Sequence, residues 1–218
     1  MRLFELFPFG ILKLITFKII YTLKYKTHHN NIKSISLTQY RMQFMEKHYT
    51  KRFKSTLAFL SKHISKKESI LDLGTPNELS KYLSENGFDV SNTAGENLDT
   101  DYALYSDLDK NVLTAFEILE HMLAPFNILK NTKANKLVAS IPLKLWFASA
   151  YWNDEDDWDK HYHEFEVKQF NFLLEKSDWE IKDSALWKSY TKYPFGFRPI
   201  LRRFYPRYYI VYCERKKS

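Results

Sequence analysis

The chain has 218 residues, of which 44% are hydrophobic and 17% aromatic. This length fits one compact domain with a short extension, and the apolar content excludes a globally disordered protein. A formal net charge of +7 favours anionic partners such as phosphorylated small molecules, acidic lipid headgroups or nucleic acid, without choosing among them. The single cysteine, Cys213, excludes an internal disulfide and favours a reducing compartment, so we expect a cytoplasmic protein.

The first 25 residues are apolar and aromatic, but Lys13 and Lys18 interrupt them and no small-residue cleavage site follows. A signal peptide therefore fits poorly, and two lysines in mid-segment disfavour a spanning helix. On a helical wheel an apolar face opposite Lys13 and Lys24 is formed by Leu12, Ile15, Ile19 and Leu23. Such a helix suits a membrane interface, and a lid packed on the protein's own core is an equal alternative.

We therefore divide the chain into two parts. Residues 1–30 form an apolar, basic, helical N-terminal segment, and residues 31–218 form the main domain. Peripheral membrane contact through residues 1–25 would place the protein at the inner face of the membrane.

The main domain begins with a predicted helix over residues 37–64, where apolar side chains recur at helical spacing. Residues 69–74, SILDLG, read as a short buried strand, followed by a turn and a helix over 79–87. Further strands are predicted at 88–93, 112–117, 136–142, 179–187 and 207–215, and further helices at 120–132 and 166–177.

Strands and helices thus alternate, which predicts an α/β fold with a mostly parallel sheet. The last two strands have no clear helix between them and can form an antiparallel pair at the sheet edge. We expect a Rossmann-like architecture: a mostly parallel central sheet flanked by helices, with an antiparallel edge strand.

The loop after the first strand reads Asp-Leu-Gly-Thr-Pro-Asn-Glu over residues 72–78. In open α/β sheets such loops face the ligand. The segment resembles the first motif of class I S-adenosylmethionine-dependent methyltransferases, D-x-G-x-G-x-G. Asp72 and Gly74 match, whereas Pro76 and Glu78 replace the second and third glycines, so the motif is degenerate. The resemblance implies cofactor contacts from Asp72, Gly74, Thr75 and Asn77.

A second and more specific resemblance covers residues 113–142, which are similar to the fourth-strand region of small-molecule methyltransferases of the ubiquinone-biosynthesis type. There a strand ends in an acidic residue and is followed by LEH and a proline-bearing turn into a helix. The matching residues are Thr114, Phe116, Glu117, Leu119, Glu120, His121, Pro125 and Leu129. A His-x-His-x-Phe stretch at residues 161–165 extends the likeness, which spans roughly residues 69–181.

The resemblance implies that S-adenosylmethionine is the cofactor. After the second strand, Glu96 is expected to accept the ribose hydroxyls, with Asp99 as the alternative, and Phe116 is expected beside the cofactor. Only about eighteen residues separate the second predicted strand from the strand at residues 112–117, so the family's third strand and its helix must be abbreviated.

Methyl transfer from a sulfonium needs a well-placed nucleophile and, for a hydroxyl, a base. By resemblance His121 is that base, and its ordinary pKa suits the task. Glu117 and His163 would also serve the acceptor. We therefore expect a methyltransferase acting on an oxygen or nitrogen of a small-molecule or lipid-linked acceptor.

The same region has the spacing of a metal site. Glu117, Glu120 and His121 would share one face of a helix, and His161 or His163 would complete the set, as in certain RNA 2'-O-methyltransferases. We do not expect a metal, because LEH caps the active-site helix in many relatives without one. For His161 and His163, solvated imidazoles in a strand-to-helix connection are an equal alternative.

Two rival functions remain open. Pro76, Glu78 and the apolar N-terminus suit a catalytically silent methyltransferase-like module that binds a membrane or protein partner. The net charge and the Glu/His set suit an RNA-modifying enzyme, although no RNA-binding signature is present and a nucleic acid partner is not expected.

Overall fold

The computed structural model describes residues 51–188, 201 and 204–217. The segment predicted over residues 1–30, and with it the proposed membrane contact, lies outside the described residues. None of the helices in the described part of the chain combines the length and the apolar character that crossing a bilayer requires.

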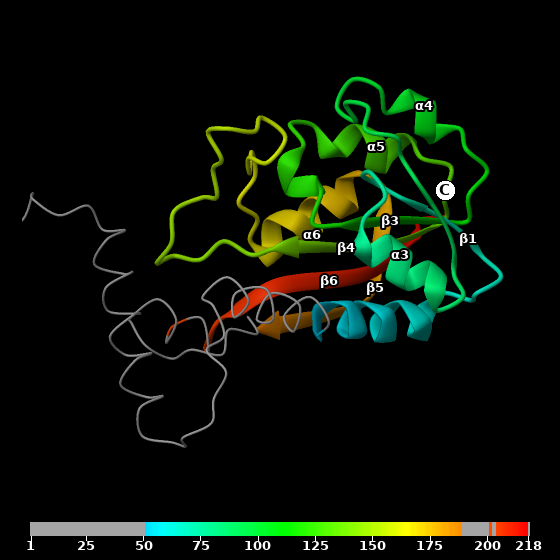
Figure 1. Cartoon of the computed structure of the whole chain (residues 1–218), viewed down its shortest axis with the longest axis horizontal. Helices are drawn as coiled ribbons and strands as arrows, with labels where there is room; N and C mark the ends of the chain where they lie inside the picture. Colours follow the sequence, from blue (N-terminus) through cyan, green and yellow to red (C-terminus); the bar gives the residue numbers. More distant parts are fainter. Residues whose placement is uncertain (1–50, 189–200, 202–203, 218) are drawn as a thin grey trace, which may run out of the picture. The chain divides into compact units, whose positions relative to one another are not determined.

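One sheet of six strands organises the domain, in the order β2-β1-β3-β4-β6-β5. The strands are β1 (Ser69–Asp72), β2 (Asp89–Asn92), β3 (Val112–Phe116), β4 (Lys136–Pro142), β5 (Trp179–Lys188) and β6 (Pro206–Arg215). The first four in this order run parallel, while β6 is antiparallel to both β4 and β5. The predicted Rossmann-like class, with its antiparallel edge, is confirmed (Figure 1).

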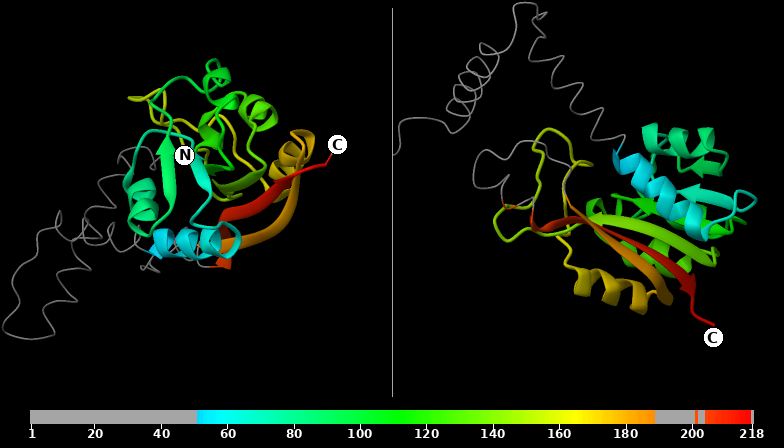
Figure 2. Two further views of the ribbon diagram at one scale, coloured as in Figure 1. Left: turned by 90° about the vertical axis from the view of Figure 1, so that its right-hand side faces the viewer. Right: turned by 90° about the horizontal axis from the view of Figure 1, so that it is seen from below.

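Helices cover both faces of this sheet because successive strand residues point to opposite sides. The first core, on one face, contains Leu71 and Leu113 and is covered by α5 (Pro125–Asn131) and α6 (Val167–Lys176). The second core, on the other face, contains Ile70 and Val112, with contributions from residues 51–63, which are helical, and from α3 (Glu78–Glu85). Both views of Figure 2 show the sheet between these two sets of helices.

The helix predicted over residues 120–132 begins later than expected, at Pro125. A short 3-10 turn, η1 (Leu119–His121), precedes it, and Met122 is extended. Proline fits the first turn of a helix, but in a longer helix its ring would clash with the carbonyl four residues earlier, that of His121. The prediction of one continuous helix was therefore wrong.

The connection between β2 and β3 is abbreviated, as predicted. Residues 93–111 contain one short helix, α4 (Ala103–Ser106), and no strand. As a result β2, a strand of four residues, forms one edge of the sheet.

The edge where the parallel strands begin is closed by Arg215 at the end of β6. Its guanidinium donates hydrogen bonds to the carbonyls of Leu129 (3.2 Å), Ser177 (3.0 Å) and Thr132 (2.6 Å), and lies 3.9 Å from the ring centroid of Trp179. Trp179 Nε1 also donates to the Leu129 carbonyl. One side chain thus satisfies carbonyls at the C-terminal ends of α5 and α6.

Cys213 precedes Arg215 by two positions in β6 and is fully buried in the first core. Burial raises the pKa of its thiol far above the ordinary value. A thiol that stays protonated is a poor nucleophile, so Cys213 acts as a small core side chain.

Candidate active site at the carboxyl ends of the parallel strands

Asp72 ends β1 in the middle of the parallel strands, and its carboxyl group joins the two neighbouring strands. Thr114 Oγ1 of β3 donates to it at 2.7 Å and Asn92 Nδ2 of β2 donates at 3.0 Å. Burial raises the pKa of Asp72 to about 6, although both hydrogen bonds oppose the shift. The predicted first-motif acid is therefore a buried carboxyl group that joins the ends of three neighbouring strands.

The loop that follows turns at Gly74, whose φ of +103° lies in the region that favours glycine. Its N–H donates to Thr93 Oγ1 at 2.8 Å, and its carbonyl accepts from Asn92 Nδ2 at 3.2 Å. Residues 75–78 are exposed within the part of the chain that the structure describes. The degenerate motif therefore keeps its turn at Gly74.

The side chain of Asn77, which is also a predicted cofactor contact, caps the helix that follows the loop. Its side-chain oxygen accepts hydrogen bonds from the N–H groups of Leu79 and Ser80, which caps α3. Ser80 Oγ in turn accepts from the Asn77 N–H at 3.0 Å. This reciprocal cap starts the helix immediately after the loop.

The loop after β2 packs against the loop after β1. Gly95 has a φ of +103°, and a Cβ atom placed on it would lie 3.3 Å from Thr75 Cγ2. Glu96 follows, and its Oε2 accepts the Ala94 N–H at 3.0 Å and the hydroxyl of Tyr105. The Tyr105 hydrogen bond lowers the pKa of Glu96, so the predicted ribose ligand is an ionised carboxylate.

Asp99 and His163 hold the turn that follows His121. The Asp99 carboxylate accepts the N–H groups of Leu123 (2.8 Å) and Ala124 (2.7 Å). On the other side, His163 Nε2 lies 3.2 Å from the Leu123 carbonyl oxygen. Because a carbonyl can only accept, His163 must carry its hydrogen on Nε2. Asp99 and His163 therefore both hold the backbone of the turn at residues 123–124.

Glu117 and Phe116 lie at the end of β3. Glu117 adopts a φ of +54°, which is costly for a residue with a side chain and occurs mainly where the surroundings impose it. Its Oε2 pairs with Arg52 Nη1 at 2.5 Å, while Phe116 is partly buried against the second core. Because Glu117 is not helical, it does not share a helix face with Glu120 and His121.

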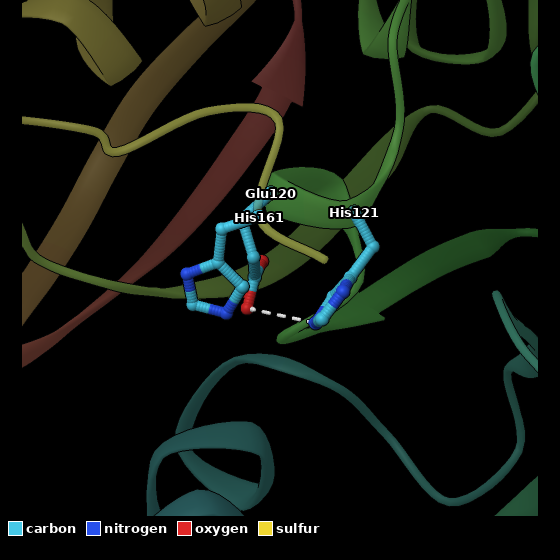
Figure 3. Close-up of side chains that lie close together, drawn as sticks. All are labelled: Glu120, His121 and His161. Atoms are coloured by element: carbon cyan, nitrogen blue, oxygen red, sulfur yellow. Dashed lines mark ion pairs between the residues drawn. The ribbon is translucent and has the colours of Figure 1, made fainter. Parts of the chain in front are cut away.

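Glu120, His121 and His161 come together beyond β3 (Figure 3). One possible ligand atom from each lies within 4.8 Å of the others. The Glu120 side chain is only 1% exposed, and among the described residues neither its Oε2 nor His121 Nδ1 has a hydrogen-bond partner. Buried polar atoms of this kind are rare in native proteins and mark functional sites.

The electrostatics of this cluster favour neutral groups. Burial, followed by the charge of Glu117, raises the pKa of Glu120 well above its ordinary value. Burial, followed by the proximity of His161, lowers the pKa of His121. The shift of the Glu120 pKa therefore favours its protonated form, and the shift of the His121 pKa favours the neutral imidazole with an available lone pair.

His161 is oriented by a second carboxylate. Its Nδ1 lies 3.0 Å from Glu164 Oε1, which also accepts the Tyr151 N–H. The Glu120 carbonyl accepts the N–H groups of Tyr162 (2.9 Å) and His163 (3.1 Å), which anchors this loop to η1. An Nδ1–H donated to Glu164 leaves the His161 Nε2 lone pair available, the arrangement in which histidine binds metals.

The three side chains therefore fit a divalent ion, since one carboxylate and two imidazoles are suitable ligands and one possible ligand atom of each lies within 4.8 Å of the others. Of the set predicted from sequence, Glu120, His121 and His161 are brought together. Glu117 instead pairs with Arg52, and His163 contacts the Leu123 carbonyl.

A cavity of about 220 Å³ lies beyond the carboxyl end of β4. It is lined by Leu143, Lys144, Leu145, Trp146, Glu166, Val167, Tyr205 and Pro206. The rings of Trp146 and Tyr205 meet edge to face, with centroids 6.3 Å apart. This mainly apolar lining suits an apolar or aromatic part of a ligand.

Sequence reasoning missed Asn92, Thr93, Arg52, Tyr105 and Glu164. Asn92 ends β2 and Thr93 follows it, and their place beside Asp72 could have been inferred from the parallel register. The other three carry no local signal, because each reaches the site only through the tertiary fold.

No family model matches the chain, and no curated protein sequence matches it. Solved structures do. A Burkholderia thailandensis 1,6-didemethyltoxoflavin-N1-methyltransferase, bound to 1,6-didemethyltoxoflavin and S-adenosylhomocysteine, is 15% identical, with a TM-score of 0.52 over 86% of this chain and 94% of that one. A chain from the complex of the Haloferax volcanii Trm112 methyltransferase activator with a methyltransferase is 10% identical, with a TM-score of 0.53 over 82% and 94%.

The [4+2]-cyclase SpnF is also similar, at 13% identity and a TM-score of 0.50 over 76% of this chain and 81% of that one. At such identities the likeness establishes the fold and leaves the chemistry to the site. The chain has the fold of class I S-adenosylmethionine-dependent methyltransferases, as the two sequence motifs indicated.

Proposed function

We propose that the protein transfers a methyl group from S-adenosylmethionine to an oxygen or nitrogen of a small-molecule or lipid-linked acceptor. The observation that carries the proposal is the position of His121, a neutral imidazole with a buried nitrogen lacking a described partner, in the first turn after β3. The glycine loop adjoins this turn, since a Cβ atom placed on Gly74 would lie 3.5 Å from Ile118 Cδ1.

The residues of the two loops fit the cofactor, which supplies an electrophilic methyl group on its sulfonium when bound. We assign its contacts to Asp72, Gly74, Thr75, Glu96 and Phe116, with Asn77 and Asp99 shaping the loops around them. The exposed crest of the glycine loop offers peptide groups near the start of α3, where an anionic group is favoured. The ionised Glu96 offers an acceptor for hydroxyl groups.

His121 would take the proton of the acceptor hydroxyl or amine. Its lowered pKa keeps the imidazole neutral and ready to accept at neutral pH. The carboxylate of Asp159, whose charge favours protonated His121, would stabilise the imidazolium that forms.

The cluster also fits a metal-assisted version of this reaction, in which Glu120, His121 and His161 would hold a divalent ion. When bound, it would orient the acceptor oxygen and lower its pKa, in place of a histidine base. Glu164 would then orient His161 as a metal ligand.

Calorimetric titration with S-adenosylmethionine and S-adenosylhomocysteine tests the proposal. We expect micromolar binding, weakened at least tenfold by Gly74→Ala, because a Cβ atom is strained at positive φ and would distort the turn of the loop. Gly87→Ala is the matched control, since Gly87 also has positive φ (+90°) but contacts Lys66, away from the site.

Turnover is measured as transfer of a radiolabelled methyl group to a panel of phenols, catechols and amines. His121→Ala should abolish transfer while leaving S-adenosylhomocysteine affinity within about threefold of the wild type. A wild-type protein that binds neither ligand at millimolar concentration would reject the proposed function.

A further inference from the structure

The shortened connection between β2 and β3 brings a tyrosine hydroxyl onto the Glu96 carboxylate. Tyr105 lies in α4, and its ring packs against the first core together with that of Tyr102. Its hydroxyl donates to Glu96 Oε2 and accepts the Ala94 N–H at 3.0 Å. The Ala94 N–H also donates to Glu96 Oε2, so three groups close a small ring of hydrogen bonds.

This ring uses only one of the two carboxylate oxygens. Oε2 receives both hydrogen bonds, and within the described part of the chain Oε1 receives none from another residue. The side chain is therefore held in one rotamer with one oxygen committed and the other available. Thr75 of the glycine loop lies beside the preceding residue, Gly95, so the loop that carries Glu96 packs against the glycine loop.

We propose that Tyr105 is a positioning residue that fixes Glu96 so that Oε1 accepts a hydrogen bond from a ribose hydroxyl of the adenosyl group. This inference rests on the proposed function and deepens it, because it assigns recognition of the sugar to a contact made by α4. The tyrosine touches the carboxylate and not the sugar. A preorganised acceptor loses less rotamer freedom on binding than a mobile one.

The proposal predicts a loss that depends on the ligand's hydroxyl groups. Tyr105→Phe keeps the ring in the core and removes only the hydroxyl, so Glu96 becomes free to rotate. We expect S-adenosylhomocysteine to bind about 5 to 10 times more weakly, the effect of losing one hydrogen bond to a charged group. The analogue that lacks the hydroxyl recognised by Glu96 cannot make this contact. Tyr105→Phe should therefore weaken the binding of that analogue, 2'-deoxy or 3'-deoxy, by less than twofold.

The experiment is calorimetric titration of the full chain with S-adenosylhomocysteine and with its 2'-deoxy and 3'-deoxy analogues. The variants are Tyr105→Phe, Glu96→Gln and the control Tyr102→Phe, which removes a hydroxyl from a neighbouring ring of the same helix region. Tyr105→Phe and Glu96→Gln should share one pattern across the ligands, and Tyr102→Phe should match the wild type.

Two results would overturn the inference while leaving the proposed function standing: unchanged affinity in Tyr105→Phe, or an equal loss for all three ligands, which would mean a general structural effect. Circular dichroism melts of each variant separate that second case from simple unfolding. A wild-type chain that binds no S-adenosylhomocysteine would overturn both proposals together.

Discussion

The two ends of the parallel strands differ in how their buried polar groups are hydrogen-bonded. Where the strands begin, Arg215 and Trp179 satisfy the carbonyls of three residues at the ends of α5 and α6. Where the strands end, Glu120 Oε2 and His121 Nδ1 are buried without a described partner, and Asp72 is buried with a raised pKa.

This difference suggests that polar groups at the starting edge serve stability, whereas those left unpartnered at the finishing edge serve function. A partnered buried group contributes to folding, whereas an unpartnered one costs free energy and persists where a ligand or a reaction uses it. Substitutions that remove a partnered polar group should therefore destabilise the protein, whereas those that remove a buried charge or an unpartnered polar atom should stabilise it. The four predictions below test that contrast, from the largest expected effect to the smallest.

Arg215→Ala should lower the free energy of unfolding by about 3 kcal/mol, because it leaves several carbonyls without a donor and removes the contact with Trp179. Urea unfolding followed by tryptophan fluorescence measures the loss. Lys216→Ala is the control, because the neighbouring Lys216 side chain donates to one exposed carbonyl, that of Glu175. Equal effects of both substitutions would contradict the proposed importance of Arg215.

Asp72→Asn should raise the free energy of unfolding by about 2 kcal/mol at pH 7.5. The folded pKa of about 6 lies above the ordinary 3.8, so the carboxyl group favours folding when protonated and loses that contribution as pH rises through this window. An amide has no charge to bury, so the gain should shrink below pH 5 and vanish near pH 3.

Thermal melts of wild type and Asp72→Asn across pH 3 to 8 measure this dependence. Asp89→Asn, at an exposed site in β2, is the control and should show no such trend. A gain that does not change with pH would show that packing, and not the charge of Asp72, is responsible.

Glu120→Met should stabilise the protein by about 1.5 kcal/mol in metal-free buffer, because an apolar side chain replaces a buried carboxyl group with an unpartnered oxygen. Glu120→Gln keeps a polar group there and should stay close to the wild type. A loss of stability in Glu120→Met would show that the carboxyl group is a structural element.

If the cluster binds a divalent ion, adding cobalt chloride to the same samples should make the wild type more stable than Glu120→Met. The wild-type melting temperature should then rise by several degrees and a visible absorption band should appear, with neither change in Glu120→Met. Identical cobalt responses in both proteins would remove the metal variant of the proposed mechanism.

Asp99→Ala should cost about 1 kcal/mol, the usual value for losing a carboxylate that caps two backbone N–H groups. Hydrogen exchange of the Leu123 amide, measured by NMR, should accelerate about fivefold. Asp109→Ala, at an exposed position in the same connection, should leave this amide unchanged. Unchanged exchange in Asp99→Ala would contradict the role assigned to this carboxylate.

Much of the fold followed from the sequence because alternating strand and helix patterns leave few topologies. All six predicted strands are present, and the short interval before β3 correctly indicated a lost strand. The error at residues 120–124 came from a helical pattern that Pro125 interrupts. Sequence periodicity does not show which side of a proline a helix will occupy.

The site was less accessible to sequence reasoning because its contacts join distant segments. Glu117 and Arg52 are 65 positions apart, and Leu123 and His163 are 40 apart. The sequence spacing grouped Glu117 with Glu120 and His121. In the structure Glu117 has a left-handed backbone conformation, and its side chain pairs with Arg52 instead. Tyr105 was missed because a lone tyrosine in a loop carries no pattern until the fold brings it to Glu96.

Burial of Cys213, the chain's one cysteine, has a practical consequence for labelling. Maleimide reagents attack thiolates, so the folded native protein should remain unmodified. A thiol introduced at exposed Trp158 or Leu104 would then be the single point of attachment for a fluorophore or spin label. Either position can thus be followed separately, with no background substitution needed in the core.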